Sequence, residues 1–558
     1  MSWSPYNGDR YLDFPELEAW CHALVEAHSD WMSLVEIGKS REGRSIWLIT
    51  VGAQSGDLDA KPAFWLDGGT HAAEWTSVMA VLHTISRWAE KLDAGDEETM
   101  ARFKETTAYV APCISPDGFQ AMQEGSPFLR SSCRPPLPGS HPVGLRPADL
   151  TGDGAIRWMR WRHEAGPWVA DPDAPMFMRH RRLDDRPEEA FFFCSEGTFL
   201  HWDGVAWADA PREFGLDLNR NFPGSWAPFR MFGMDGGAYP LSEPESRSVV
   251  DAVAARPNIA VALTNHTYTG CILTQPYRDP SPLGQADIDL FEKLAEGAVE
   301  GTGYRVIKTH PDFVYDPKVD IVGVWSDTLS TTFGIPGYTL ELWNPYSFAG
   351  VEIEKPAEFF RKPDPALIRQ LVVAFTKDPA MVSPWVTVDH PQLGEVEVGG
   401  IDYMRTIRNP PEALLPAEVG RGAVVADRML SATPRLNVTL KTEKRDGVTI
   451  VDAVVENLGY LPTAASVHAR QLELVPPLRL DLSHDDGVTI IDGELTQTLE
   501  HLEGWGSLQV SSARHAVYPG LGARSTRARV RWVVQGSGSV SVKWTAVRAG
   551  SGSVSTAL

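Results

Sequence analysis

The sequence predicts an α/β protein, with a mixed twisted sheet flanked by helices and an appended all-β sandwich. Two observations predict this fold class. Up to about residue 380, short apolar runs typical of buried strands alternate with stretches whose apolar residues recur at helical spacing. Beyond about residue 385, short alternating segments separated by turns replace that pattern. We therefore expect one domain over residues 1–380 and a β-sandwich over residues 385–558.

The composition disfavours several classes of partner. The 558 residues carry a formal net charge of −22, whereas nucleic acids and anionic membranes attract basic surfaces. No apolar run approaches the roughly 20 residues of a membrane span. The N-terminal residues lack the pattern of a secretory signal, and five scattered cysteines form no Cys-x-x-Cys motif. We expect a cytoplasmic protein with reduced thiols, and nothing in the sequence indicates its oligomeric state.

The first domain is expected to begin with a helix and a hairpin and then to alternate strands with helices. The first helix has Asp13 and Pro15 near its start and one apolar face. The expected elements before the middle of the domain are helix 13–30, strands 33–38 and 45–51, strand 63–66, helix 74–92, strand 107–113 and a turn at 115–118. Those after it are a helix from 242–245 to about 255, strand 259–266, helix 284–301, strand 337–342 and a last helix at 365–377.

The second domain is expected to contain only short strands. Turns such as Arg445-Asp446-Gly447 separate several of them. The Gly/Ser-rich tail from residue 535 is expected to hold a final strand and a loose end. The clearest strand candidates are 436–440, 448–451, 488–491, 528–534 and 540–544.

Residues 131–214 differ from the rest of the first domain. They are rich in Pro, Arg, Trp and Asp and show little periodicity, so we expect an insertion that folds over one face. Within it, Asp149, Thr151 and Asp153 place oxygens at alternate positions, as in the first half of a calcium loop. Arg160 stands where the closing Glu belongs, so we favour a polar turn over a Ca²⁺ site.

His71 and Glu74 lie between a predicted strand and a predicted helix. Gly68 and Gly69 supply the turn between the two elements. Strand-to-helix junctions at the carboxyl edge of an α/β sheet are the usual place for chemistry. An imidazole and a carboxylate three residues apart can both reach one metal ion. The alternative is a helix-capping histidine beside a solvated first-turn glutamate.

Several motifs taken together carry more information than this pair alone. In chain order they resemble the zinc carboxypeptidase A-like metallopeptidases, over roughly residues 10–380 apart from the insertion. The thermolysin-like His-Glu-x-x-His motif does not occur. The matching motifs are His71-Ala72-Ala73-Glu74-Trp75, Ser115-Pro116-Asp117-Gly118-Phe119, Arg130, Asp217-Leu218-Asn219-Arg220-Asn221, His266-Thr267-Tyr268 and Thr339-Leu340-Glu341-Leu342.

The resemblance implies one zinc site and the residues around it. His71, Glu74 and His266 would be the ligands, and the fourth tetrahedral position would stay open, as in catalytic zinc sites. Glu341 would be the general base that takes a proton from water. Arg130 would stabilise the oxyanion of the tetrahedral intermediate.

The resemblance also implies how a substrate is held. Asn219 and Arg220 match the pair that binds a terminal carboxylate, for which the planar guanidinium is suited. Asp217 matches an acid that orients a ligand histidine. Tyr268 matches a tyrosine that lines the cleft, although a packed aromatic side chain is an equally good interpretation.

Three departures from the family pattern stand out. Ala73 occupies a position that is often Arg in the family. The family's mobile tyrosine has no clean match, because counting back from the general base reaches Val319, and Tyr315 requires a local loop shift. Ser326 and Asp327 both lie near the specificity position, and the sequence does not decide between them.

The function expected from the resemblance is that of a zinc-dependent metallocarboxypeptidase. It would hydrolyse the C-terminal peptide or amide bond of peptides with a free carboxylate. One alternative is a zinc amidohydrolase acting on acylated amino acids or cell-wall-type peptides, and another is a non-catalytic binding protein on the same fold. We expect the insertion to rim the cleft and the β-sandwich to stabilise or dock the enzyme, with substrate binding as its alternative role.

Overall fold

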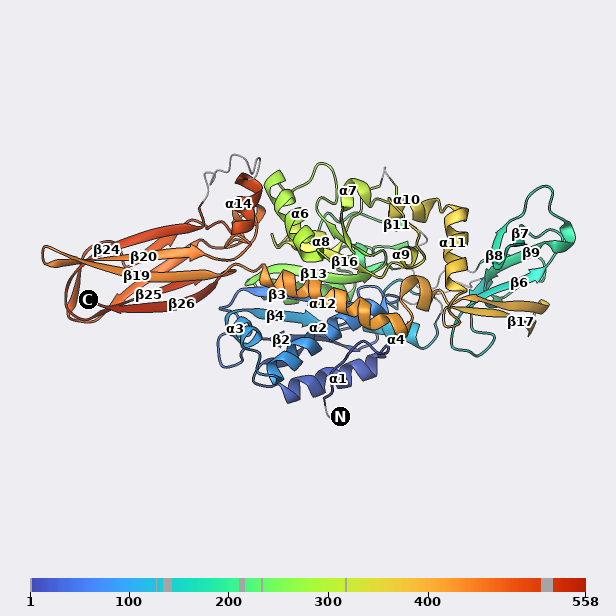
Figure 1. The fold of residues 1–558 in the computed structure, drawn as a ribbon, viewed down its shortest axis with the longest axis horizontal. Helices are drawn as coiled ribbons and strands as arrows, with labels where there is room; N and C mark the ends of the chain where they lie inside the picture. Colours follow the sequence, from blue (N-terminus) through green and yellow to red (C-terminus); the bar gives the residue numbers. More distant parts are fainter. Residues whose placement is uncertain are drawn as a thin grey trace.

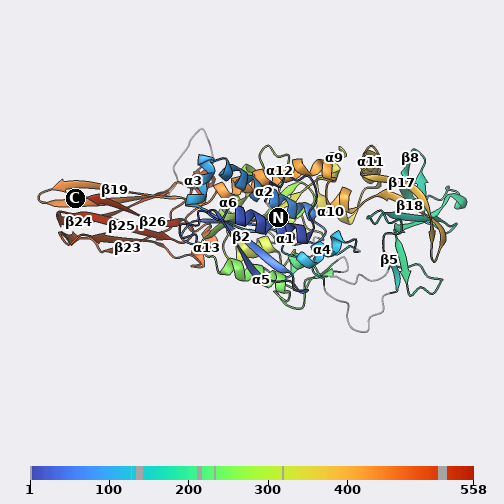
Figure 2. The same cartoon turned by 90° about the horizontal axis from the view of Figure 1, so that it is seen from below.

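The computed structural model describes residues 3–126, 128–133, 143–209, 216–231, 234–316, 319–512 and 525–558. Three parts follow one another along the long axis of the molecule in both views (Figures 1 and 2). An all-β part lies at one end, an α/β core in the middle, and a smaller sheet at the other end. The predicted fold class is confirmed.

The core contains an eight-stranded mixed sheet with the strand order β1-β2-β4-β3-β13-β16-β14-β15. The pairs β3–β4, β3–β13, β13–β16 and β14–β15 are parallel, whereas β1–β2, β2–β4 and β14–β16 are antiparallel. The strands are β1 (Met32–Lys39), β2 (Ser45–Val51), β3 (Ala63–Asp67), β4 (Thr107–Ala111), β13 (Ile259–Thr267), β14 (Cys271–Thr274), β15 (Arg305–Lys308) and β16 (Gly337–Leu342).

The central strands are buried on both faces. Along β3, Phe64 and Leu66 enter one hydrophobic cluster, whereas Ala63 and Trp65 enter another, as the two-residue period of a strand requires. The first cluster lies under α1 (Phe14–Ala27), α2 (Trp75–Asp93), α3 (Glu97–Glu105), α4 (Pro116–Gln123), α6 (Gln285–Val299) and α12 (Leu415–Ser431). The second lies under α5 (Pro244–Ala254) and α8 (Trp325–Thr331). The turn expected at 115–118 is the first turn of α4.

Parallel pairing places the carboxyl ends of three central strands at one edge of the sheet. In the register, Thr264 of β13 pairs with Asp67 of β3, and His266 pairs with Glu341 of β16. The segments that follow these strands therefore meet at the same edge, where the expected functional residues lie.

The insertion forms strands, contrary to the expected loop region. β6 and β9 pair over five residues, from Trp158↔Ser195 to Arg162↔Phe191. Its strands are β5 (Gly144–Pro147), β6 (Trp158–Arg162), β7 (Trp168–Asp171), β8 (Ala174–His180), β9 (Phe191–Ser195) and β10 (Gly197–Leu200). Residues 134–142 and 210–215 of the expected insertion lie outside the described residues.

The sandwich does not begin at residue 385 as expected. β17 (Val382–His390) and β18 (Gly394–Ile401) belong to the insertion's sheet, whose order is β17-β18-β6-β9-β7-β8. The chain then returns to the core, where α12 packs against α2 and α6. For the same reason α11 (Pro365–Phe375) is not the last helix of the core.

The all-β part consists of two four-stranded antiparallel sheets. Val451, Leu480, Trp532 and Val542 are fully buried between them. The tail expected to be loose is paired, because β26 joins β25 along its length. The sheets are β19-β20-β24-β22 and β23-β21-β25-β26, formed by β19 (Leu436–Arg445), β20 (Val448–Asn457), β21 (Leu478–His484), β22 (Val488–Asp492), β23 (Thr496–Leu499), β24 (Arg527–Gly536), β25 (Ser539–Ala546) and β26 (Gly550–Ala557).

One arginine joins the sandwich to the core. The buried guanidinium of Arg548 donates hydrogen bonds to the carbonyl oxygens of Phe333 at 2.6 Å, Gly334 at 2.9 Å and Ala464 at 3.0 Å. The junction is thus held by charge-assisted bonds to backbone oxygens.

The remaining elements are short. They are β11 (Arg230–Met231), β12 (Met234–Asp235), α7 (Thr309–Asp312), α9 (Pro345–Phe348), α10 (Pro356–Arg361), a π-helical turn at Met404–Arg408, α13 (Val467–Gln471) and α14 (Trp505–Ser512). Among the described residues, none of the helices combines the length and apolar composition that a membrane crossing needs.

Candidate active site

A tight turn links β3 to α2 and carries two of the expected site residues. Gly69 has φ +68°, which favours glycine, and a Cβ on Gly68 would lie 2.6 Å from the carbonyl oxygen of Ser77. The Ser77 hydroxyl donates to the carbonyl oxygen of Glu74 at 2.6 Å and accepts from Gly69 N–H at 3.0 Å. These contacts fix the turn, and with it the positions of His71 and Glu74.

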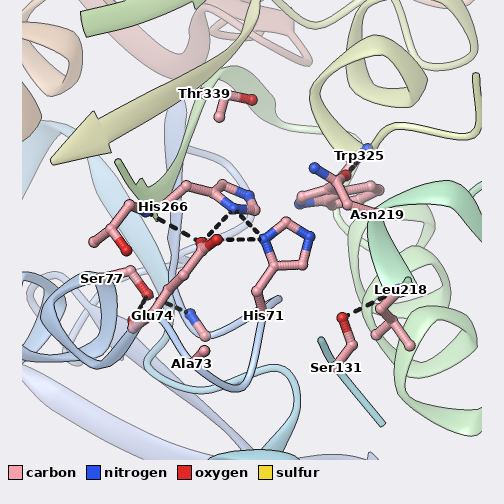
Figure 3. A network of polar contacts seen from close by, with 12 residues as sticks. His71, Ala73, Glu74, Ser77, Ser131, Leu218, Asn219, His266, Trp325 and Thr339 are labelled. Atoms are coloured by element: carbon pink, nitrogen blue, oxygen red, sulfur yellow. Dashed lines mark hydrogen bonds and ion pairs between the residues drawn. The ribbon is translucent and has the colours of Figure 1, made fainter. Parts of the chain in front are cut away.

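His71, Glu74 and His266 converge on one point, although they are far apart in the sequence (Figure 3). Their ligand-type atoms all lie within 4.8 Å of one another, and all three residues are buried. His71 Nδ1 lies 2.9 Å from Glu74 Oε1, and His266 Nδ1 lies 2.9 Å from Glu74 Oε2. The two Nδ1 atoms are 3.0 Å apart.

This arrangement fits a bound Zn²⁺. His71 Nε2 lies 3.1 Å from Asp217 Oδ1, so donation from Nε2 leaves the lone pair of Nδ1 directed at the cluster. In this buried site, two imidazole nitrogens point toward each other and toward the same carboxylate. A cation bound by all three groups explains this arrangement. Two histidines and one carboxylate also form the donor set of catalytic zinc sites.

Two buried carboxylates, one in the cluster and one beside it, are held in their charged form. Burial opposes the charge on Glu74, but His71 and His266 outweigh it and hold the pKa of this carboxyl well below its usual range. Burial likewise opposes the charge on Asp217, and Arg130, Arg220 and His71 hold its pKa well below the usual range. Both groups are therefore anions at neutral pH.

Glu341 lies beside the cluster, because its strand position pairs with that of His266. It lines a cavity of about 860 Å³ that Glu74 and Asp217 also reach. Desolvation raises the pKa of Glu341 to about 7, with His266 lowering it and the Glu74 carboxylate raising it. A carboxylate with such a pKa can both accept and return a proton near neutral pH.

Arg130 joins the same group of charges. Its Nη1 donates to Glu74 Oε1 at 3.0 Å, and its Nε donates to Asp217 Oδ2 at 3.4 Å. The guanidinium also lines the cavity. The structure thus brings Arg130 together with one of the three expected ligands, Glu74, and with Asp217 beside His71.

Asn219 and Arg220 lie on a 3₁₀ turn that the Asp217 side chain caps. The amide oxygen of Asn219 accepts from Trp325 N–H at 2.8 Å, which leaves its NH₂ group to act as a donor. Arg220 lines the cavity, and its Nε has no hydrogen-bond partner among the described residues. The Arg220 guanidinium carbon lies 5.0 Å from the centre of the Phe229 ring.

The remaining substrate-binding and specificity candidates differ in whether they reach the cavity. Tyr268 and Tyr315 both line the cavity, whereas Val319 is 40% exposed. Ser326 is buried against Tyr277 and Thr339, and the Asp327 carboxylate accepts from Gln275 and Ser225. Neither Ser326 nor Asp327 is among the described residues that line the cavity.

The insertion contributes part of the cavity wall. Its residues Pro147, Asp149, Gly154, Ala155, Ile156 and Ser195 line it. In the loop weighed as a calcium site, Asp149 accepts from N–H groups of residues 151, 152 and 154, and Asp153 accepts from residues 155 and 157. This is the pattern of the polar turn that the sequence favours, and the alternative of a Ca²⁺ site there stays untested.

Sequence reasoning missed the contribution of the chain beyond residue 400. Asp402, Tyr403, Arg405 and Arg408 line the cavity and lie on or just before the π-helical turn. A turn of this kind has no periodic signature, and nothing in the spacing of residues 402–408 links them to the metal ligands.

Fold and site together define a metal-dependent hydrolase. The parallel strands of a mixed α/β sheet present a buried His-Glu-His set, a neighbouring carboxylate and arginines at the edge of one cavity. Residues 17–350 match the zinc carboxypeptidase family, and the chain belongs to this family. It is a zinc-dependent metallocarboxypeptidase that carries one Zn²⁺. Residues 436–557 match a family described only as a domain of unknown function.

Individual relatives agree with this assignment. Carboxypeptidase B of Astacus astacus is 29% identical over 313 residues, which cover 55% of this chain and 77% of that protein. Carboxypeptidase A5 of Macaca fascicularis is 30% identical over 320 residues, covering 55% of this chain and 53% of that protein. The crystal structure of thrombin activatable fibrinolysis inhibitor aligns with a TM-score of 0.42 and 17% identity, over 76% of this chain and 77% of that one. Family membership rests on the sequence matches.

Proposed function

We propose that this enzyme removes C-terminal residues from peptides with a free carboxylate, using His71, Glu74 and His266 as zinc ligands. The observation that carries the proposal is the convergence of these three side chains at the strand edge where Glu341 also lies. Bound zinc would supply a Lewis acid that polarises the scissile carbonyl and lowers the pKa of water.

Glu341 is proposed as the general base. Its place beside His266 and its raised pKa suit a carboxylate that takes a proton from the attacking water. The water and the departing amine are both at the scissile bond, so the same carboxyl can then give that proton to the amine. The proton taken from water thus ends on the leaving group.

Arg130 is proposed to stabilise the negative charge that develops on the substrate's carbonyl oxygen. Its side chain is only 13% exposed and is held by two carboxylates, so its orientation is set before substrate binds. A preorganised donor stabilises a developing oxyanion better than water does.

Asn219, Arg220 and Tyr315 are proposed to hold the terminal carboxylate, and Tyr268 to line the cleft. The NH₂ group of Asn219 and the Nε of Arg220 are donors without a hydrogen-bond partner among the described residues. A substrate carboxylate would satisfy both through charge-assisted bonds. Tyr315 lines the same cavity, and burial raises its pKa, so it remains a neutral phenol donor.

A peptide-library digest followed by mass spectrometry tests this function. The intact enzyme should release C-terminal residues, and a chelator or Glu341→Gln should abolish release. Peptides with an amidated C-terminus should resist cleavage, because they lack the carboxylate that Asn219 and Arg220 would bind. Equal cleavage of free and amidated peptides would contradict carboxylate recognition, and would favour a broader amidohydrolase.

We further propose that residues 1–380 supply the zinc ligands and the base of a catalytic core that α12 completes, and that the insertion at 131–214 limits which substrates enter. The six insertion residues in the cavity wall support this role. A variant in which a short linker replaces residues 144–200 should accept bulkier substrates. An unchanged substrate range would count against the proposed role.

We propose a cytoplasmic location for the enzyme. The support is that Cys21, Cys113, Cys133, Cys194 and Cys271 form no disulfide within the described residues. Fractionation of the source cells, with an antibody against the protein, tests this location.

A further inference from the structure

Besides Arg130, a second arginine lies next to the proposed zinc ligands, and it comes from outside the segment that matches the family. Arg408 ends the π-helical turn Met404–Arg408, whereas the family match ends at residue 350. Its Nη1 lies 3.8 Å from Glu74 Oε1, and its side chain is 18% exposed. It lines the same cavity as Arg130 and Glu341.

Aromatic rings fix the plane of this guanidinium. Its central carbon lies 5.2 Å from the ring centre of Tyr268, 5.4 Å from that of Phe128 and 5.8 Å from that of Tyr403. Nε of Arg408 donates to the hydroxyl of Tyr403 at 3.1 Å. Cation–π contacts of this kind attract a guanidinium to the aromatic rings and so restrain its position.

The turn itself is fastened to the metal-binding loop. The fully buried Asn409 donates to the carbonyl oxygen of Ala73 at 2.9 Å and accepts from Thr76 N–H at 2.9 Å. These bonds lie on either side of Glu74 in the sequence. The position of Arg408 is therefore coupled directly to the loop that carries two of the proposed zinc ligands.

The terminal nitrogens of Arg408 have unused donors. Arg130 donates to two carboxylates, at 3.0 and 3.4 Å. The Nη atoms of Arg408, in contrast, make no hydrogen bond to any part of the chain that the structure describes, and the 3.8 Å approach to Glu74 is too long for one. A guanidinium held beside a cavity with free N–H groups is suited to bind an acceptor oxygen of a ligand.

The position of Arg408 indicates which part of a substrate it meets. In the view of Figure 3, Glu74 and Asn219 lie on opposite sides of the His71 ring. If the terminal carboxylate is bound at Asn219 and Arg220, as the proposed function requires, the acyl part of the peptide extends toward Glu74. On that side Arg408 lies 3.8 Å from Glu74 and over the ring of Tyr268, which also lines the cavity.

We propose that Arg408 is a substrate-binding residue that donates hydrogen bonds to a backbone carbonyl oxygen of the peptide, one residue before the residue whose carbonyl is cleaved. It supplies this contact from a segment outside the family match. Rigid aromatic neighbours keep the donor in place, so peptides long enough to present this carbonyl are preferred over shorter ones.

Two synthetic substrates isolate the carbonyl. The first is a 4-oxo-4-phenylbutanoyl amide of the amino acid that the enzyme releases fastest, and the second is the matching 4-phenylbutanoyl amide, which has CH₂ in place of the ketone. The intact enzyme should have a kcat/KM about 10- to 100-fold higher on the ketone. Arg408→Met should remove this difference by lowering kcat/KM on the ketone alone, with zinc content and melting temperature unchanged.

Arg405→Met is the matched control. Arg405 belongs to the same turn and lines the same cavity, but it pairs with Asp402 at 3.3 Å and lies over Trp75. Its substitution should change kcat/KM equally on the two substrates. An equal loss on both substrates for Arg408→Met, or no loss, would overturn the proposal. If the intact enzyme cleaved neither substrate nor any peptide with a free carboxylate, the proposed function itself would fail.

Discussion

His266 and Glu341 occupy paired positions on the adjacent parallel strands β13 and β16. This register places a proposed zinc ligand and the proposed base side by side without any loop between them. Rigid strands hold reacting groups more precisely than loops do. The chemistry therefore depends on a backbone register that the two buried strands fix.

Glu341→Gln tests the base directly. Gln keeps the size of the side chain but cannot accept the proton of water, so kcat should fall by about 10²- to 10⁴-fold. Zinc content, measured by atomic emission, should stay at one ion per chain. A variant with more than a tenth of the original kcat would show that Glu341 is not the base.

Asp217→Asn tests how the ligand His71 is oriented. Asn still accepts from Asn219 N–H, so the turn should fold, but it lacks the charge that favours donation from His71 Nε2. Zinc affinity should fall about 10- to 100-fold in competition with a chelator. Asp149→Asn removes a carboxylate from the cavity wall that contacts no proposed ligand in the described residues, and should leave zinc affinity unchanged.

Glu245→Gln tests a pH dependence of stability. Burial, with Asp117 and Glu243 nearby, raises the pKa of Glu245 from 4.5 to about 7. The folded chain then binds this proton more tightly than the unfolded chain, so Glu245 lowers the free energy of unfolding progressively as pH rises from about 4.5 to about 7.

Gln carries no ionisable proton, so the variant should gain up to about 3 kcal/mol over the original protein at pH 8 and little at pH 4.5. Urea unfolding at the two pH values measures this difference. Glu243→Gln is the control, because Glu243 is paired with Arg41 at 2.6 Å and its substitution should destabilise the protein at pH 8. A Glu245→Gln variant that is less stable at pH 8 would contradict the assigned pKa direction.

Arg548→Met tests the junction between sandwich and core. The substitution leaves three buried carbonyl oxygens without this donor, and should lower the free energy of unfolding by about 3 kcal/mol. Proteolysis near residue 433, between α12 and β19, should become faster. Arg479→Met is the control, because among the described residues that exposed arginine pairs only with side chains of its own sandwich. Its substitution should change the free energy of unfolding by less than about 0.5 kcal/mol.

Much of the core could be predicted because each of its strands and helices shows a clear pattern of apolar residues. Buried parallel strands such as Ile259–Thr267 read as continuous apolar runs, and helices such as Trp75–Asp93 show one apolar face. The structure brings His71, Glu74 and His266 together, as expected for a metal site, although their individual roles remain predictions.

The strands of the insertion could not be predicted, because they show no clear division between one apolar face and one polar face. In β6 (Trp158-Met159-Arg160-Trp161-Arg162), the basic Arg160 is buried while the aromatic Trp161 is partly exposed. The partner strand β18 lies more than 230 residues away along the chain, as the pair Met159↔Val398 shows. Pairing at this distance leaves no local signal, and the same holds for the turn that carries Arg408.

The hairpin β17–β18 has a practical consequence for anyone who works with a shortened form of this enzyme. Cutting the chain where the family match ends, at residue 350, would strip the insertion's sheet of two strands and expose the edge of β6. It would also uncover the surface of α2 against which α12 packs. An unprotected strand edge promotes aggregation, so the smallest fragment that we expect to remain soluble extends through Ser431.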